Sequence, residues 1–245
     1  MKKWIKPVSL VLALCVFLLA MPMVLAAPAV PTTQWKDYAA ADFAGGTGTQ
    51  EDPYLIETAE QFAKIAADVS NRIYHNGDFF RLENNLDLSA HRWNPIGQYN
   101  WLSDGSTVSN YFGGFLDGNN KTITGLIVDE REDKYAAGLF GAVSNPSKTR
   151  TVGVKDLTIS NADIRATDKE QNVSYAGILI AFAMTNDGCT IDVTNVNVSG
   201  KTSYDYTNTA DGGAPAGGMF GSANRLTVKN CNVTDIEITG TNNCG

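Results

Sequence analysis

Histidine, cysteine and positive charge are all scarce in this sequence of 245 residues. It has two His, four Cys, and 19 Lys and Arg against 26 Asp and Glu. The net charge of −7 argues against a general attraction to nucleic acid, which requires a basic face to neutralise phosphates. His75 and His91 lack the four-residue spacing of a zinc-binding pair. The sequence therefore predicts no metal site and no cofactor, and both histidines are expected on loops or at the surface.

The cysteines do not form the pattern of a disulfide framework. Removal of the N-terminal segment described next would leave Cys189, Cys231 and Cys244, an odd number that allows at most one pair. Their separations of 42 and 13 residues match neither close zinc-binding cysteines nor a dense set of disulfides. We expect Cys189 and Cys231 to be small, buried apolar residues.

Long apolar runs are absent after the first residues of the chain. Lysines precede the apolar run Val8–Leu19, and small residues follow at 24 and 26, a pattern that is typical of a secretory signal peptide over residues 1–26. A permanent membrane anchor is the alternative, but Pro22 and the small residues after it favour cleavage near Ala27. The sequence thus predicts a secreted or cell-surface protein with no membrane span after cleavage.

Residues 27–42 are polar, contain proline and lack periodicity, which predicts a linker before a domain over 43–245. Within that domain, Thr58 followed by Gln61 forms a capping box that opens a helix. Apolar residues then recur at helical spacing, so the sequence predicts one helix over 58–73 with a single buried face. That face comprises Phe62, Ile65, Ala66, Val69 and Ile73.

The rest of the sequence predicts short strands separated by turns. Alternating apolar residues occur in FFRLENNLDLS (79–89), NYFGGFLDGNNKTITGLIV (110–128), VKDLTIS (154–160), IDVTNVNVSG (191–200) and LTVKNCNVTDIEITG (226–240). We expect the alternating residues in the core, together with Phe112 and Phe115.

One phrase occurs three times, as YAAGLFG at 135–141, YAGILIA at 175–181 and AGGMFG at 216–221. Gly138, Gly177 and Gly218 lie 39 and 41 residues apart, a spacing that indicates a repeat architecture. One glycine-flanked strand plus one alternating strand cannot bury its apolar side alone, whereas stacked copies share a core. The sequence therefore predicts an all-β solenoid in which these three glycines lie in register.

The series GGTGTQEDPYLIETAEQFAKIA (45–66), FRLENNLDLS, WNPIG, FGGFLDGNNKTITGL and the repeated phrase resembles secreted bacterial surface proteins with GLUG-type repeats. Such repeats also occur in the N-terminal region of some IgA-cleaving metallopeptidases. The resemblance covers residues 43–240 and implies a right-handed parallel β-helix whose N-terminal end is covered by the helix. Residues 176–181 depart from it, since they lack the Phe and the second Gly. The sequence contains no HExxH motif, so peptidase activity does not carry over.

These observations favour a non-catalytic extracellular module, either a spacer or an adhesin-like unit that binds a glycan or a protein. The alternative is a carbohydrate-active enzyme, a polysaccharide lyase or glycosidase, which requires opposed carboxylates or a base with a cation. No pair stands out, and no catalytic residue is predicted, because turns, strand ends and a charged loop account for each available carboxylate. These are Asp87, Asp117, Asp129, Glu130, Glu132 and Asp133.

Aromatic side chains can bind the CH face of a sugar ring when polar groups lie nearby. Tyr99, Trp101 and Tyr111 belong to the polar segment QYNWLSDGSTVSNY and are the predicted ligand-binding residues, with core packing or loop anchoring as the alternative. Trp93, in WNPIG, is expected to be structural.

The strand at 226–240 is the last one predicted, and no helix or charged cover is apparent after it. Solenoids need polar terminal repeats to remain soluble, and unpaired strand edges attract other strands. We therefore expect Val233, Ile236 and Ile238 at an open edge that further repeats or a partner would cover.

Overall fold

The computed structural model describes residues 30–101, 107–131, 136–167, 175–205 and 216–240. The compact unit of the chain begins at Pro31. The predicted signal peptide, Cys244 and the carboxylates Glu132 and Asp133 lie outside the described residues.

Strands account for most of the described structure, in agreement with the predicted all-β class. The helical elements are the short 3-10 helix η1 (Trp35–Tyr38) and the α-helix α2 (Ala59–Ser70). The strands are β1 (Tyr54–Ile56), β2 (Phe79–Leu82), β3 (Leu86–Asp87), β4 (Gln98–Trp101), β5 (Thr107–Asn110), β6 (Phe115–Thr124), β7 (Ile127–Asp129), β8 (Phe140–Asn145), β9 (Gly153–Thr167), β10 (Ala176–Gly177), β11 (Ile180–Thr185), β12 (Ile191–Asp205), β13 (Ala216–Gly217), β14 (Phe220–Ala223), β15 (Leu226–Lys229) and β16 (Asn232–Gly240).

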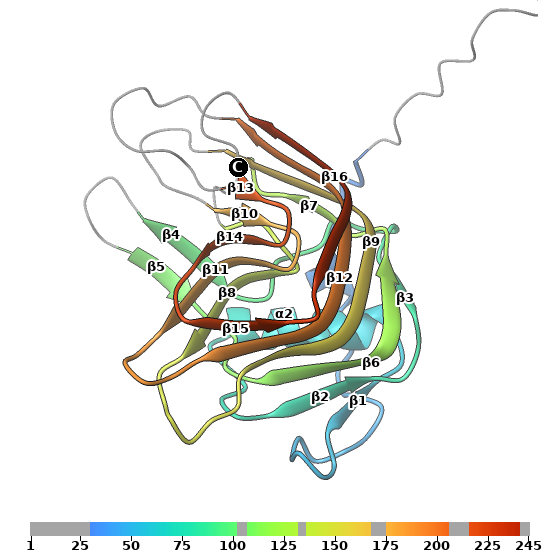
Figure 1. The fold of residues 1–245 in the computed structure, drawn as a ribbon. Helices are drawn as coiled ribbons and strands as arrows, with labels where there is room; N and C mark the ends of the chain where they lie inside the picture. The colour runs from blue at the N-terminus through green and yellow to red at the C-terminus, as the bar shows by residue number, and fades with distance from the viewer. Residues whose placement is uncertain (1–29, 102–106, 132–135, 168–174, 206–215, 241–245) are drawn as a thin grey trace, which may run out of the picture. The chain divides into compact units, whose positions relative to one another are not determined.

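Apart from the antiparallel pair β4 and β5, the strands stack in parallel as a β-solenoid of about four turns, which confirms the predicted repeat architecture. The largest sheet follows the order β1-β2-β6-β9-β12-β15, with β3, β7 and β16 paired at its side. A second parallel sheet contains β8, β11 and β14. Figure 1 shows these coils lying one behind another, with β15 and β16 at the near end.

A row of inward-facing residues builds the core of the large sheet. Phe80, Leu116, Val154 and Val193 are consecutive partners in register, and each is at most 2% exposed. Alternation predicted Phe80, Val154 and Val193 of this row, because successive side chains of a strand point to opposite faces, but it did not identify Leu116. Stacked apolar rows of this kind exclude water from the interior, and this burial provides the main stabilising free energy of the fold.

Polar residues stack where the long strands bend. Asp156, Asn195 and Asn230 all have φ between 52° and 55°, a left-handed conformation that Asn and Asp tolerate better than most residues. The Asn195 side-chain amide donates to Asp156 Oδ1 at 2.7 Å, and the Asn230 amide donates to Asn195 Oδ1 at 3.2 Å. This ladder places the bend at the same position in successive coils.

The helix α2 begins as the capping box predicts. The Thr58 hydroxyl accepts from the Gln61 backbone N–H, and the Gln61 side chain accepts in return from the Thr58 N–H. The helix buries Phe62 against Trp93, with ring centroids 4.9 Å apart, and the Trp93 indole donates to the Leu139 carbonyl. Trp93 is therefore structural, as expected. Viewed from β15 and β16, α2 lies behind the coils (Figure 1).

The predicted helix end at residue 73 was wrong. The helix ends at Ser70, and Arg72 has a φ of 67°, which is incompatible with continuing a right-handed helix. Ile73 is consequently 54% exposed rather than part of the buried face.

Part of the segment predicted as a linker belongs to the compact domain. Trp35 is 4% exposed, its indole donates to the Leu88 carbonyl, and its backbone N–H donates to the Arg92 carbonyl. His75 lies on the loop between α2 and β2, as expected, but it is buried, at 7% exposure, and bridges the carboxylates of Asp68 and Asp78. His91 stacks on the exposed ring of Tyr38.

The glycine phrases stack, and the predicted register holds for one of the two steps. Ala137 pairs with Ala176, which puts Gly138 level with Gly177 as predicted, but the next step differs. Gly177 pairs with Gly217, not with Gly218, and Ile180 pairs with both Phe140 and Phe220. A Cβ on Gly177 would lie 2.6 Å from the Gly221 nitrogen. The glycines are therefore required for close backbone packing between coils.

The last described coil is the most exposed. Val228 and Val233 are 46% and 47% exposed, although they continue the inward-facing rows, while Ile236 is half-buried. Both cysteines within the described residues are free thiols: Cys189 is buried as expected, whereas Cys231 is half-buried.

Candidate ligand-binding site

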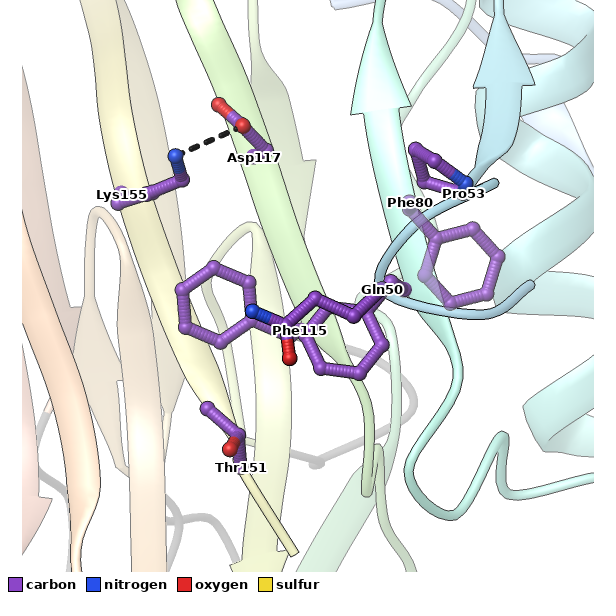
Figure 2. A pocket seen from close by; sticks show the side chains of 8 residues that line it. Gln50, Pro53, Phe80, Phe115, Asp117, Thr151 and Lys155 are labelled. Carbon is purple, nitrogen blue, oxygen red and sulfur yellow. Dashed lines mark ion pairs between the residues drawn. The ribbon is translucent and has the colours of Figure 1, made fainter. Parts of the chain in front are cut away.

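A pocket of about 360 Å³ opens on the outer face of the large sheet, where β2, β6 and β9 lie side by side (Figure 2). Its size lies within the range of small-molecule sites, roughly 300–1,000 Å³. The lining residues are Gln50, Pro53, Phe79, Phe80, Phe115, Asp117, Thr151 and Lys155.

Strand parity places two aromatic rings on this outer face. Because Phe80 and Leu116 point inward, their neighbours Phe79 and Phe115 point outward. The two outward rings are half-buried, with centroids 5.7 Å apart and planes at 37°. Phe115 was predicted as a core residue, and that prediction was wrong. On β9 its register partner is Gly153, which adds no side chain beside the ring.

A row of charged residues lies next to the aromatic pair. Arg81, Asp117 and Lys155 are consecutive register partners on β2, β6 and β9. Lys155 Nζ lies 2.9 Å from Asp117 Oδ2 and 3.4 Å from Asp156 Oδ2. Asp117 Oδ1 also accepts from the Asn119 backbone N–H at 2.8 Å.

The ion pair fixes the charge state of the lysine. The hydrogen bond with Asp117 raises the pKa of the Lys155 ammonium, partial burial lowers it by less, and the Asp117 charge adds to the rise. Lys155 therefore remains protonated at neutral pH and presents N–H donors beside an acceptor carboxylate. Arg81 forms its own pair with Glu83, at 2.6 Å.

The loop before β1 forms one wall of the pocket. The Thr47 and Gly48 N–H groups both donate to the Asp52 carbonyl at 3.0 Å, and the Gly48 carbonyl accepts from the Phe79 N–H at 2.8 Å. Gly46 has a φ of 82°, and a Cβ there would meet the Pro53 carbonyl. These contacts hold the exposed side chain of Gln50 beside the aromatic pair.

Figure 2 shows the resulting arrangement. Phe115 lies between the Asp117–Lys155 pair and Thr151, and the Gln50 side chain extends across it. The site thus combines an apolar surface with a carboxylate acceptor, an ammonium donor, an amide and a hydroxyl. Such a set can orient a small polar ligand that also has an apolar face.

The predicted residues Tyr99 and Tyr111 lie elsewhere, beside the second parallel sheet. Tyr99 is 9% exposed and stacks on Phe182, with centroids 3.7 Å apart, and burial raises the pKa of its hydroxyl. Tyr111 is half-buried and stacks on Tyr74 at 4.7 Å. The backbone of Trp101 pairs with Thr107 in the β4–β5 hairpin, and its side chain lies outside the described residues. Packing thus occupies one face of the Tyr99 and Tyr111 rings.

The carboxylates considered for catalysis have individual local partners. Asp87 accepts from the Ser89 N–H, which lowers its pKa, and Asp129 is held by Arg131 through two hydrogen bonds of 2.6 and 2.7 Å. Glu130 is 6% exposed, and Asp117 pairs with Lys155. In the part of the chain that the structure describes, no group of three or more His, Cys, Asp or Glu side chains is arranged to hold a metal ion.

The pocket residues could have been found from strand parity alone. In FFRL, assigning Phe80 and Leu82 to the core puts Phe79 and Arg81 outside, and in FLD the inward Leu116 puts Phe115 and Asp117 outside. Pairing those strands in parallel juxtaposes two aromatic and two charged side chains. Gln50 and Thr151 form the other walls of the pocket. They lie on loops, and the periodicity of the sequence does not indicate where those loops lie.

Comparison with known proteins gave partial matches. No family model matches the chain. The chain is 32% identical over 118 residues to a protein of Evansella cellulosilytica provisionally named a Gly-rich membrane protein; the match covers 46% of this chain. It is also 32% identical over 131 residues, 50% of its length, to halomucin of Haloquadratum walsbyi. It spans 12% of the first relative and 1% of the second.

Among solved structures, a chain from Bacteroides ovatus provisionally described as an immunoglobulin A1 protease aligns with a TM-score of 0.33 and 14% identity. The alignment covers 82% of this chain and 83% of that one. Within the described residues, no helix has the length and apolar character needed to cross a membrane.

Proposed function

We propose that this chain is a non-catalytic module of a secreted or cell-surface protein, adhesin-like rather than a passive spacer, that binds an extracellular glycan or protein. We also propose that it belongs with the GLUG-type repeat proteins that its motifs resemble. The observation that supports binding is the pocket on β2, β6 and β9, where outward aromatic rings adjoin an ion pair. Apolar side chains on an outer face cost solubility, so their retention beside oriented polar groups favours a ligand site.

The proposed extracellular location is supported by the secretory pattern at residues 1–26 and by a match to a relative named as a membrane protein. A β-solenoid suits such a location because stacked coils form a stiff scaffold that presents side chains on fixed outer faces.

The alternative, a polysaccharide lyase or glycosidase, requires a base or a pair of carboxylates acting on bound sugar. Asp117 is the carboxylate that lines the pocket, and it is paired with the Lys155 ammonium. A carboxylate held in this way favours binding over catalysis, because its two oxygens are already engaged by Lys155 and by the Asn119 backbone N–H. We therefore propose that the chain releases bound polysaccharide unaltered.

The test is a binding screen of the full chain against immobilised glycans and extracellular matrix proteins, together with the variants Phe79→Ala and Phe115→Ala. Met184→Ala is the matched control, because Met184 is a 46% exposed apolar side chain on β11, away from the pocket. We expect a ligand that the wild type and the control retain and both phenylalanine variants lose. Binding that survives both phenylalanine substitutions would contradict the proposed site.

Product analysis on the same glycans tests the catalytic alternative. Prolonged incubation should create no new reducing ends and no unsaturated sugars. Release of either product by the wild type, and its loss in Asp117→Asn, would identify the chain as an enzyme.

A further inference from the structure

We propose that the pocket on β2, β6 and β9 binds a neutral hexopyranose residue of a polysaccharide. This inference rests on the proposed function and names the class of ligand. The apolar surface of the pocket is the pair Phe79 and Phe115, which are half-buried and tilted by 37° with respect to each other. A pyranose has a CH face of similar shape, so burying it against an aromatic ring removes apolar surface of both partners from water.

The polar groups match the edge of a sugar ring. Asp117 Oδ2 and Lys155 Nζ are 2.9 Å apart, so an acceptor and a donor stand side by side at one end of the pocket. Two neighbouring hydroxyls could occupy them together, one donating to the carboxylate and the other accepting from the ammonium. Gln50 and Thr151 each supply both a donor and an acceptor for the remaining hydroxyls. Figure 2 shows this pair and Thr151 on opposite sides of Phe115.

The local charge favours a neutral sugar over a uronate. Lys155 already contacts two carboxylates, those of Asp117 and Asp156, and the neighbouring Arg81 is paired with Glu83. An anionic sugar would therefore approach carboxylates whose cations are already engaged, within a chain of net charge −7. A neutral ring avoids this repulsion while using the same hydrogen-bonding groups.

The position of the pocket favours a sugar over an extended peptide. Peptides commonly bind sheets by adding a strand at an open edge, where backbone groups are unpaired. The lining strands β6 and β9 instead have parallel partners on both sides. Strand β6 lies between β2 and β9, and strand β9 lies between β6 and β12. Their outer face therefore offers side chains rather than a free backbone edge.

The experiment is isothermal titration of the full chain with cellohexaose, mannohexaose and hexagalacturonate. We expect saturable binding of at least one neutral hexasaccharide and binding of hexagalacturonate that is at least about tenfold weaker. Phe115→Ala should weaken the neutral interaction by about tenfold or more, because it removes the apolar platform. Asp117→Asn should also weaken it, and Met184→Ala should not; unchanged thermal unfolding in each variant verifies folding.

Several results would overturn the inference. The inference fails if the chain binds neither neutral hexasaccharide, or if it binds hexagalacturonate more tightly than both. It also fails if Phe115→Ala binds the neutral hexasaccharide as well as the wild type does. If the chain binds a matrix protein or the charged sugar in a manner that requires Phe115, the neutral-sugar inference fails while the proposed binding function stands. If no glycan or protein binds, both fail.

Discussion

Phe140 and Phe220 occupy equivalent positions in the two coils on either side of Ile180, since each is a register partner of that residue, yet they differ in burial. Phe140 is 1% exposed, whereas Phe220 is half-buried. Phe140 has Ile180 on one side and the ring of Phe112 at 5.1 Å on another. Phe220 lies in the last described coil. The contribution of one repeated side chain to stability therefore depends on its position in the stack.

Replacement of Phe140 by Ala is predicted to lower the free energy of unfolding by about 3–5 kcal/mol, the usual cost of truncating a buried aromatic residue. Phe220→Ala should cost less, about 1–2 kcal/mol, because much of its cavity would be open to water. Urea denaturation of both variants measures the difference. A larger loss for Phe220 would contradict the assignment of the core.

The glycine phrase provides a second stability test. In Gly177→Ala the new Cβ would meet backbone atoms of Phe220 and Gly221 at 2.8 and 2.6 Å, so adjacent coils must separate. We expect a loss of about 1–3 kcal/mol, typical of overpacking. Gly45→Ala is the control, because its Cβ would have its nearest contact at 3.6 Å. Equal stability of the two variants would show that close packing at Gly177 is not required.

Asp129 should make stability depend on pH. Burial raises the pKa of its carboxyl, but the hydrogen bonds and charge of Arg131, with the charge of Arg165, lower it below its usual 3.8. Because the pKa of Asp129 is lower in the folded state, its ionised carboxylate contributes its full stabilisation above pH 3.8. That stabilisation is lost as the pH falls through the folded-state pKa. Asp129→Asn should lower the free energy of unfolding by about 1 kcal/mol at neutral pH, a modest loss because Arg131 is partly exposed. The difference from the wild type should shrink in acid, where Asp129 is protonated.

The control for Asp129 is Asp187→Asn, since Asp187 is 93% exposed although it pairs with Arg225. Exposed pairs contribute little, so this variant should follow the wild type at each pH. Thermal unfolding between pH 2 and pH 7 provides the comparison. A deficit for Asp129→Asn that is constant with pH would refute the ionic explanation.

Hydrogen exchange should distinguish the coils. Among the described strands, β16 pairs with β12 alone, whereas β9 pairs with strands on both sides. Val228 and Val233 are also nearly half exposed. We predict that amides at 226–240 exchange much faster than those at 154–160, or are protected only at concentrations where chains associate. Uniform protection in a demonstrated monomer would contradict this prediction.

Local patterns predicted much of the fold correctly. The capping box located the start of α2, and alternation identified Phe80, Val154 and Val193 as core residues, because both depend on neighbouring positions in the sequence. The end of α2 was missed because periodicity continued to Ile73 by coincidence after Arg72 had turned the chain. The predicted pairing of Gly177 with Gly218 was wrong because backbone hydrogen bonding, not the similarity of the repeated phrases, sets the alignment between coils.

The ligand site was less accessible from sequence. Tyr99 and Tyr111 lie in a polar segment, but tertiary contacts with Phe182 and Tyr74 cover part of each ring. Phe115, in contrast, follows two glycines and precedes a leucine, a setting that resembles core sequence. Its outward direction follows only once Leu116 is fixed as an inward residue. The pocket then depends on the stacking of three strands that are distant in sequence.

The most direct test of the account is amide chemical-shift mapping of the isotope-labelled chain, titrated with the neutral hexasaccharide that binds most tightly. The largest shifts should occur at residues 79–81, 115–117 and 151–155, which belong to β2, to β6, and to β9 with the loop before it, around the pocket. Shifts centred instead on 98–101 and 107–111, or shifts absent at saturation, would show that the pocket is not the binding site.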